Sequence, residues 1–344
     1  MNIGLINISK QYPREPIHME KIIFRPVLLA ALLSLPFLLP TCTYARDRLA
    51  GFDLEVNGGQ RKDQFDWNIA GDVAGTNPNI LSELTWDDLE INEINAKAKI
   101  VVVNTKVPFA GMVKGGVGYG EITSGENRDS DYGLDNRNGE WSRSNNRSNH
   151  GDVWDAKIAG GVIFMSSNRV FSLAPHGGYS FSRQELTIHD GVQTISGVNP
   201  FGGPNPPLPG PIPGLDSTYD GEWQTGFIGL DLEYKPSPKF EIYGGVELHF
   251  GQYEAEADWN LRADFRHPVS FTHESDEALG LLANGGLRIG WKNVLLNAEI
   301  RYSNFEAEDG IDTTYFSNGT IGKTKLNEVN WDSISVTGGI TFRF

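Results

Sequence analysis

Apolar residues recur at every second position over many stretches of this chain. In the last stretch, "SISVTGGITFRF" (333–344), one parity carries Ile334, Val336, Ile340, Phe342 and Phe344. The other parity is polar or small, so the period of two predicts a β-strand with one apolar and one polar face. The same alternation is found in 240–250, 279–291 and 294–302.

The whole pattern predicts ten strands. They are expected at about 52–66, 81–102, 108–123, 152–165, 170–189, 218–234, 239–257, 271–291, 294–308 and 326–344. Tight turns are expected at 104–108, 166–169, 235–239 and 291–293, and long polar loops at 67–80, 124–151, 190–217, 258–270 and 309–325. Short turns on one side and long loops on the other are typical of outer-membrane barrels. The predicted fold is therefore all-β: a transmembrane antiparallel β-barrel of ten strands. A secreted soluble β-protein is the alternative.

The first 45 residues are predicted to be a signal peptide. Lys21 and Arg25 precede an apolar stretch at 26–40, and small residues at 43–45 predict cleavage after Ala45. Met19 is an alternative start, and a lipoprotein anchored at Cys42, the only cysteine, is an alternative processing route. Residues 46–344 are then one barrel domain, exported to the outer membrane of a Gram-negative bacterium.

The net charge is strongly negative. The leader carries +2, which leaves −17 on the remaining chain against −15 for the whole. An acidic surface argues against nucleic-acid binding. No stretch after the leader approaches 18 apolar residues, so no transmembrane helix is expected.

Charges of both signs fall on the predicted inward faces. They are Glu93, Lys97, Lys99, Asp231, Glu233, Glu241, Glu247, Arg288, Glu299 and Arg301. Ten strands leave a narrow interior, so we expect these groups to pair or to keep water. His249 is expected to form hydrogen bonds there. The Pro/Gly-rich run 199–214 cannot pair as a strand and is predicted to be a mobile surface loop; a domain linker is the alternative.

The terminal strand resembles the signal by which bacterial outer-membrane barrels are recognised by their assembly machinery. The residues that match are Thr337, Gly339, Phe342 and Phe344. The resemblance implies the barrel-assembly machinery as a partner.

The chain also resembles the omptins, ten-stranded outer-membrane proteases. The matching stretches are "LSELTWDDLEI" (81–91), "ENRDSDYG" (126–133), "GGYSFSR" (177–183) and "FGQYEAEADWN" (250–260). The omptin mechanism uses two acidic residues that hold a water, opposite an Asp–His pair that acts as base. The resemblance places the first pair at Asp129 and Asp131 and the base's carboxylate at Asp258.

The second half of that mechanism is incomplete in this sequence. Asn260 stands where the His is expected, and an amide cannot exchange a proton near neutral pH. His267 and His273 follow later, and a loop could bring one of them back. A solvated acidic loop is the plain alternative for Asp129 and Asp131, and a Ca²⁺ site is a third. No metal or other cofactor is expected.

Tyr179 and Arg183 match omptin residues that hold lipopolysaccharide, so the resemblance implies a lipopolysaccharide contact. The alternative is that the Arg183 side chain simply extends along the apolar surface to reach water.

The sequence thus favours a non-proteolytic, omptin-like outer-membrane barrel. Its long loops are expected to bind an unknown extracellular ligand, or its lumen to form a narrow, porin-like pore. The alternative is an omptin-type aspartate endopeptidase that cleaves near basic residues.

Overall fold

The computed structural model describes residues 48–104 and 109–344, and the chain from Asp47 to Phe344 forms one compact unit. The predicted signal peptide, the alternative start Met19, Cys42 and most of the turn 104–108 lie outside the described residues. The described elements are β1 (Arg48–Ile69), β2 (Ser82–Asn104), β3 (Phe109–Leu134), β4 (Asn138–Arg147), β5 (Asp152–Met165), β6 (Phe171–Ser196), β7 (Gly210–Pro211), β8 (Asp216–Ser237), β9 (Phe240–Asp258), β10 (Phe271–Trp291), β11 (Val294–Tyr315) and β12 (Ile321–Arg343).

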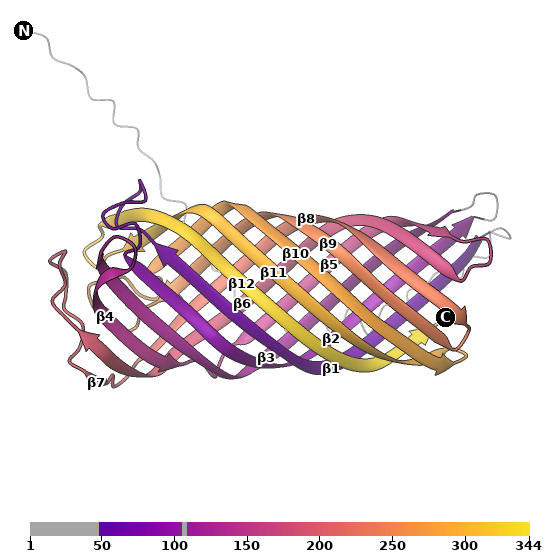
Figure 1. Ribbon diagram of the computed structural model, residues 1–344, viewed down its shortest axis with the longest axis horizontal. Helices are drawn as coiled ribbons and strands as arrows, with labels where there is room; N and C mark the ends of the chain where they lie inside the picture. The colour runs from indigo at the N-terminus through magenta and orange to yellow at the C-terminus, as the bar shows by residue number, and fades with distance from the viewer. Residues whose placement is uncertain (1–47, 105–108) are drawn as a thin grey trace, which may run out of the picture. The chain divides into compact units, whose positions relative to one another are not determined.

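The strands form a closed antiparallel ring. β4 and β5 occupy one position between β3 and β6, and β7 is a two-residue edge on β6, so the ring has ten positions. The last strand closes on the first, with Val56 opposite Ile340 and Asp53 opposite Arg343. Closure satisfies the backbone hydrogen bonds that an open edge would leave unpaired in lipid. The predicted fold class is confirmed, and Figure 1 shows the strands winding obliquely, with β7 and the C-terminus at opposite ends.

The half of the barrel near the C-terminus has an apolar outer face, and we call it the membrane zone. Alternate outward residues there are exposed and apolar, such as Val56, Ile94 and Val336 (42, 57 and 58% exposed). Along β12 and the residue that follows it, the outward set runs from Ile334 to Phe344, close to the nine to eleven residues that a tilted strand needs to cross a bilayer. Inward neighbours such as Ser335 and Thr341 are buried. The predicted parity is therefore confirmed.

The other half of the barrel, which we call the mouth zone, has the opposite arrangement. Its inner face is apolar and its outer face is polar, as on β1, where Phe65 and Trp67 are buried and Lys62 is exposed. Its core joins rings from opposite walls: Trp86 on β2 lies 5.5 Å from Tyr219 on β8, and Trp223 on β8 lies 6.4 Å from Trp331 on β12, between ring centroids. The mouth zone is thus packed like a water-soluble barrel.

The mouth zone corrects the predicted loops. Much of 124–151 and 309–325 and the first part of 190–217, predicted as loop, is strand, because β3, β6 and β11 continue to Leu134, Ser196 and Tyr315. The prediction that the run 199–214 cannot pair as a strand is wrong at one point, since Gly210 and Pro211 pair with β6 as β7. The connectors that remain at this end are 70–81, 135–137, 197–215, 259–270 and 316–320. Polar residues on the outward parity of a strand that stands in water resemble loop residues, which explains the error.

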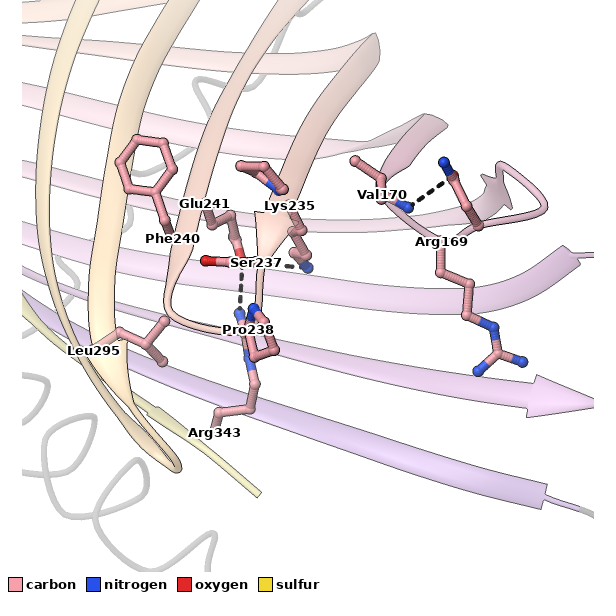
Figure 2. Close-up of a pocket in the computed structure, with 11 residues that line it drawn as sticks. Arg169, Val170, Lys235, Ser237, Pro238, Phe240, Glu241, Leu295 and Arg343 are labelled. Atoms are coloured by element: carbon pink, nitrogen blue, oxygen red, sulfur yellow. Dashed lines mark hydrogen bonds and ion pairs between the residues drawn. The ribbon is translucent and has the colours of Figure 1, made fainter.

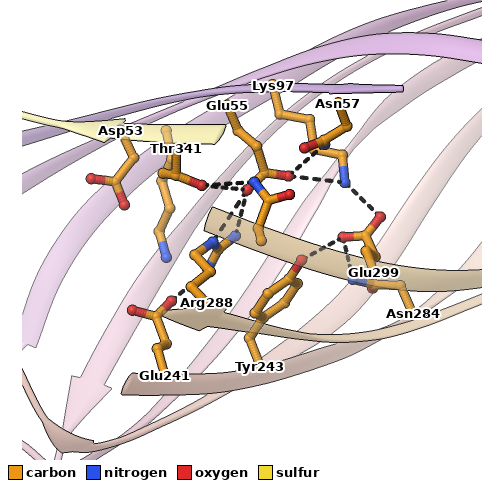
Figure 3. A network of polar contacts seen from close by, with 12 residues as sticks. Asp53, Glu55, Asn57, Lys97, Glu241, Tyr243, Asn284, Arg288, Glu299 and Thr341 are labelled. Atoms are coloured by element: carbon orange, nitrogen blue, oxygen red, sulfur yellow. Dashed lines mark hydrogen bonds and ion pairs between the residues drawn. The ribbon is translucent and has the colours of Figure 1, made fainter. Parts of the chain in front are cut away.

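Ion pairs across the lumen fill the membrane zone. Lys97 Nζ on β2 lies 2.6 Å from Glu299 Oε1 on β11, and Arg288 Nη2 on β10 lies 2.9 Å from Glu55 Oε2 on β1 (Figure 3). His249 is 2% exposed and bonds Ser180 and Thr225 through Nδ1. The prediction that the inward charges pair is confirmed for these groups, and a charge that pairs with the opposite wall takes up the space of a channel.

Candidate site at the extracellular mouth

Asp129 and Asp131 lie on one face of β3 near the end of the β3–β4 hairpin. Asp129 is opposite Leu84, a buried core residue, and Asp131 is opposite Ser82. Directly opposed residues of an antiparallel pair point to the same side, so both carboxylates face the inside of the mouth. We call them the acid pair. The long connectors leave at this end, which is the extracellular end of an outer-membrane barrel.

Burial dominates the electrostatics of the acid pair. It raises the pKa of Asp129 well above its usual range, and the charge of Asp131 raises that pKa further. Burial also raises the pKa of Asp131 to about 6, against the lowering effects of Ser82, Arg262 and Ser142. Because like charges repel, the two carboxylates hold a proton more readily than isolated ones.

The connector 259–270 supplies a partner for the third predicted acid. His267 Nδ1 lies 2.6 Å from Asp258 Oδ1, so an Asp–His pair does exist in this protein. His267 Nε2 lies 3.3 Å from the backbone oxygen of Arg262. Both ring nitrogens of His267 therefore lie within hydrogen-bond distance of an oxygen acceptor.

Arg262 is the cationic group of this connector that acts on the acid pair. Its positive charge lowers the pKa of both Asp129 and Asp131. Its guanidinium forms a fork with Asp264, at 3.0 and 2.9 Å, and lies over the ring of Phe265 at 4.0 Å. Arg262 is thus a cationic group of this loop whose charge acts on both members of the acid pair.

Asn260 and His273 have structural roles. The Asn260 side chain accepts from Asp216 N and Ser217 Oγ and donates to Gly214 O, which ties its connector to the start of β8. His273 is fully buried in the mouth-zone core, where Nδ1 bonds Tyr219 Oη at 2.9 Å. Sequence spacing offered no way to choose His267, because the loop brings together residues nine positions apart.

The predicted lipopolysaccharide residues lie on the outer face of β6. Tyr179 is 49% exposed and donates to Gln224. Arg183 forms a fork with Asp220 and lies 3.4 Å from Glu185, which raises its pKa. Its charge is therefore already met by carboxylates of this chain. The lipopolysaccharide contact stays a prediction, and an incoming phosphate has to compete with Asp220.

The residues of the predicted assembly signal lie at the β1–β12 seam. Phe344 N donates to Phe52 O at 2.8 Å, and the two rings lie 5.9 Å apart between centroids. Phe342 is outward and 37% exposed, whereas Thr337 points inward and is buried. Recognition by the assembly machinery stays a prediction.

Two cavities are lined by residues other than the acid pair. One, of about 340 Å³, lies at the turn end and is lined by Arg169, Lys235 and Arg343 among others (Figure 2). Lys235 and Arg343 both pair with Glu241, at 3.3 and 3.2 Å, so most of its positive charge is neutralised. The other, of about 540 Å³, lies between β2, β3, β4 and β6 and is lined by polar side chains such as Arg128 and Asn146.

Within the described residues, no group of three or more His, Cys, Asp or Glu side chains is arranged to hold a metal, and no helix is long and apolar enough to span a membrane.

A family model described as Pom, Protochlamydia outer membrane protein, matches residues 55–344. The chain belongs to this family. It is accordingly an outer-membrane β-barrel protein, and the matched region covers nearly the whole described barrel. No curated protein matches the sequence.

A solved outer-membrane barrel has the same fold. The outer membrane protease OmpT of Escherichia coli superposes with a TM-score of 0.66 at 16% identity, over 86% of this chain and 97% of that one. OprG of Pseudomonas aeruginosa (TM-score 0.30, 11% identity, 87% and 97% covered) and the NalP translocator domain of Neisseria meningitidis (0.34, 15%, 85% and 88%) match more loosely. The likeness to OmpT shows an omptin-like barrel.

Proposed function

We propose that this protein is a non-proteolytic surface receptor, which binds a cationic peptide segment at its acidic extracellular mouth. The observation that carries the proposal is the pairing of His267. With Nδ1 on Asp258 and Nε2 on the Arg262 carbonyl, neither nitrogen is free to accept a proton from a water at the acid pair.

Binding follows from the charges. The two carboxylates of the acid pair lie close together, so their negative potentials add and attract a cation that approaches them. Arg262 supplies part of that positive charge but keeps its own fork with Asp264. A lysine or arginine of a peptide can therefore add to the acid pair without displacing an internal ion pair.

The lumen argues against a pore. Aromatic rings from opposite walls are within contact distance in the mouth zone, and Lys99 on β2 reaches Glu233 on β8 across the membrane zone at 2.5 Å. A continuous water-filled path would have to break both the aromatic core of the mouth zone and the ion pairs of the membrane zone. We therefore favour surface binding over conduction.

An omptin-type endopeptidase is the second candidate, and the Asp258–His267 pair favours it. The acid pair would hold the attacking water, and His267 would take its proton while Asp258 orients the ring. This mechanism requires Nε2 to leave the Arg262 carbonyl and turn towards the acid pair.

One experiment separates the two candidates. The protein is refolded in detergent with lipopolysaccharide and mixed with a fluorescent dibasic peptide; anisotropy reports binding and mass spectrometry reports cleavage. We expect saturable binding of the intact peptide, weakened at least tenfold in Asp129→Asn/Asp131→Asn. Asp190→Asn, which removes an exposed carboxylate beside Arg147, is the matched control and should bind normally.

Two results would overturn the proposal. Cleavage that disappears in Asp131→Asn and in His267→Ala would establish the endopeptidase. Equal affinity for dibasic and diacidic peptides would show that the acid pair selects no cation.

A further inference from the structure

A proline-rich connector between β6 and β8 stands out on the extracellular end. It is held at both ends: Gly197 N donates to Trp141 O at 2.6 Å, and Ile212 N donates to Gly191 O at 2.8 Å. Gly210 and Pro211 pair with Gln193 and Val192 as β7. The segment between these anchors is therefore presented on a fixed base (Figure 1, at β7).

The sequence dictates the backbone of that segment. "PNPPLPGPIP" (204–213) has six prolines, each of which fixes φ near −65° and removes an N–H. Every residue that precedes a proline is pushed towards extended or polyproline II geometry. Each of residues 203–208 is a proline, precedes a proline, or both. The backbone of 204–209 therefore has little conformational entropy left to lose on binding.

The side chains of this segment are apolar and unusually exposed. Leu208 is 84% exposed, and Pro204, Pro207 and Pro209 are also exposed. Pro206, by contrast, is half-buried and faces the protein. Asn199 holds the start of the run through Asn205 Oδ1 and Pro204 O, while the side chains of Pro204, Pro207 and Leu208 are exposed. The two prolines lie three residues apart, which is one turn of a polyproline II helix.

The charge around the segment narrows the choice of partner. Residues 190–220 contain no Lys or Arg. A partner with an acidic pocket for a basic side chain would therefore find no such side chain here. Proline rings and a leucine side chain instead fit an uncharged groove lined by aromatic side chains.

We propose that residues 204–209 form a docking strand for a partner domain with an aromatic-lined, polyproline-reading groove. The partner packs its aromatic rings against Pro204, Pro207 and Leu208. Because prolines and anchors have already ordered the segment, binding spends little of its free energy on ordering the chain. This interaction is separate from the acid pair and independent of the cationic ligand proposed above.

The test uses the refolded full-length barrel and three purified probes: a WW domain selected for Pro-Pro-Leu-Pro, an SH3 domain and an EVH1 domain. Surface plasmon resonance should show saturable binding to the WW domain. We expect Leu208→Ala and Pro207→Ala each to weaken it at least tenfold. Phe201→Ala is the matched control, since Phe201 is a 52% exposed apolar residue of the same connector outside the proline run, and it should bind as the wild type does.

Gel mobility before and after boiling confirms that each variant is folded. Binding by none of the three probes would overturn the proposal, as would equal losses in Phe201→Ala and Leu208→Ala, which indicate general stickiness. Self-association that disappears in Leu208→Ala would assign the segment to a second copy of the barrel instead.

Discussion

Replacement of Trp223 by alanine tests the apolar core of the mouth zone. Trp223 is 1% exposed, and its ring lies 4.5 Å from Tyr253, 5.5 Å from Phe305 and 6.4 Å from Trp331 between centroids. A buried Trp removes on the order of 200 Å² from water, which at about 25 cal/mol per Å² corresponds to about 5 kcal/mol. A compact unfolded state reduces this figure, and measured Trp→Ala losses are about 3–5 kcal/mol. We expect Trp223→Ala to lower the free energy of unfolding by about 4 kcal/mol.

Urea unfolding in lipid vesicles, followed by circular dichroism and by heat-dependent gel mobility, measures this loss. Trp291→Ala is the control, because Trp291 is 61% exposed in the membrane zone and contacts Lys239 through a cation–π interaction at 3.5 Å. Its loss should be about 1 kcal/mol or less. If Trp223→Ala costs no more than Trp291→Ala, the mouth zone is not a packed core and the reasoning fails.

Three further predictions concern the lumen, the acid pair and the seam. Arg288→Met removes the cation shared by Glu55 and Glu241, which keep Lys97 and Lys235 as partners, and should cost about 1–3 kcal/mol by the same unfolding assay, whereas Lys62→Met breaks only an exposed pair with Asp88 and should leave the stability close to that of wild type. The pKa of Asp131 is raised to about 6, so its ionisation destabilises the folded state as pH rises from about 4 to about 6; Asp131→Asn should match wild type at pH 4 and exceed it by about 1–3 kcal/mol at pH 7.5, and equal stability at both pH values contradicts this. In Gly339→Ala the new Cβ overlaps the Val56 carbonyl oxygen across the closing seam, while in Gly338→Ala the nearest atom is Asn297 O at 3.6 Å; only the former should lower the yield of heat-modifiable barrel on refolding.

The strands and their parity could be predicted because each crosses the membrane zone with alternate apolar residues. Ile334 and Val336 mark the lipid-facing side of β12 directly. The polar parity of β10 and β11, which carries Arg288 and Glu299, indicates a lumen with ion pairs. The ring of ten needed only these patterns and the alternation of short and long connectors.

The mouth zone escaped prediction for a physical reason. Trp331 and Ser335 share the inward parity of β12, and Asp332 and Val336 share the outward one. The apolar face switches sides where the strand leaves lipid, because water then lies outside the barrel and the inside must supply the core. The period of two is unbroken at that point, so the alternation alone does not mark the boundary.

The candidate site was predictable only in part. Asp129 and Asp131 lie two residues apart on a strand, so their shared face follows from local geometry. The partner of Asp258 depends on how the connector 259–270 folds. Asn260 accepts a hydrogen bond from the backbone of Asp216 and so joins that connector to β8. Such loop contacts join residues whose spacing carries no periodic signal.

Spin labels at single cysteines test most directly whether the apolar face changes from the outside of the barrel to the inside. The only native cysteine, Cys42, is replaced by serine, and one cysteine at a time is introduced at Val56, Ile94, Lys62 or Glu90, all on outward faces of β1 and β2. In lipid vesicles, Val56 and Ile94 should be accessible to oxygen and protected from a water-soluble nickel chelate, whereas Lys62 and Glu90 should show the reverse. Equal access of the chelate to all four positions would contradict a barrel whose one half lies in lipid and whose other half stands in water.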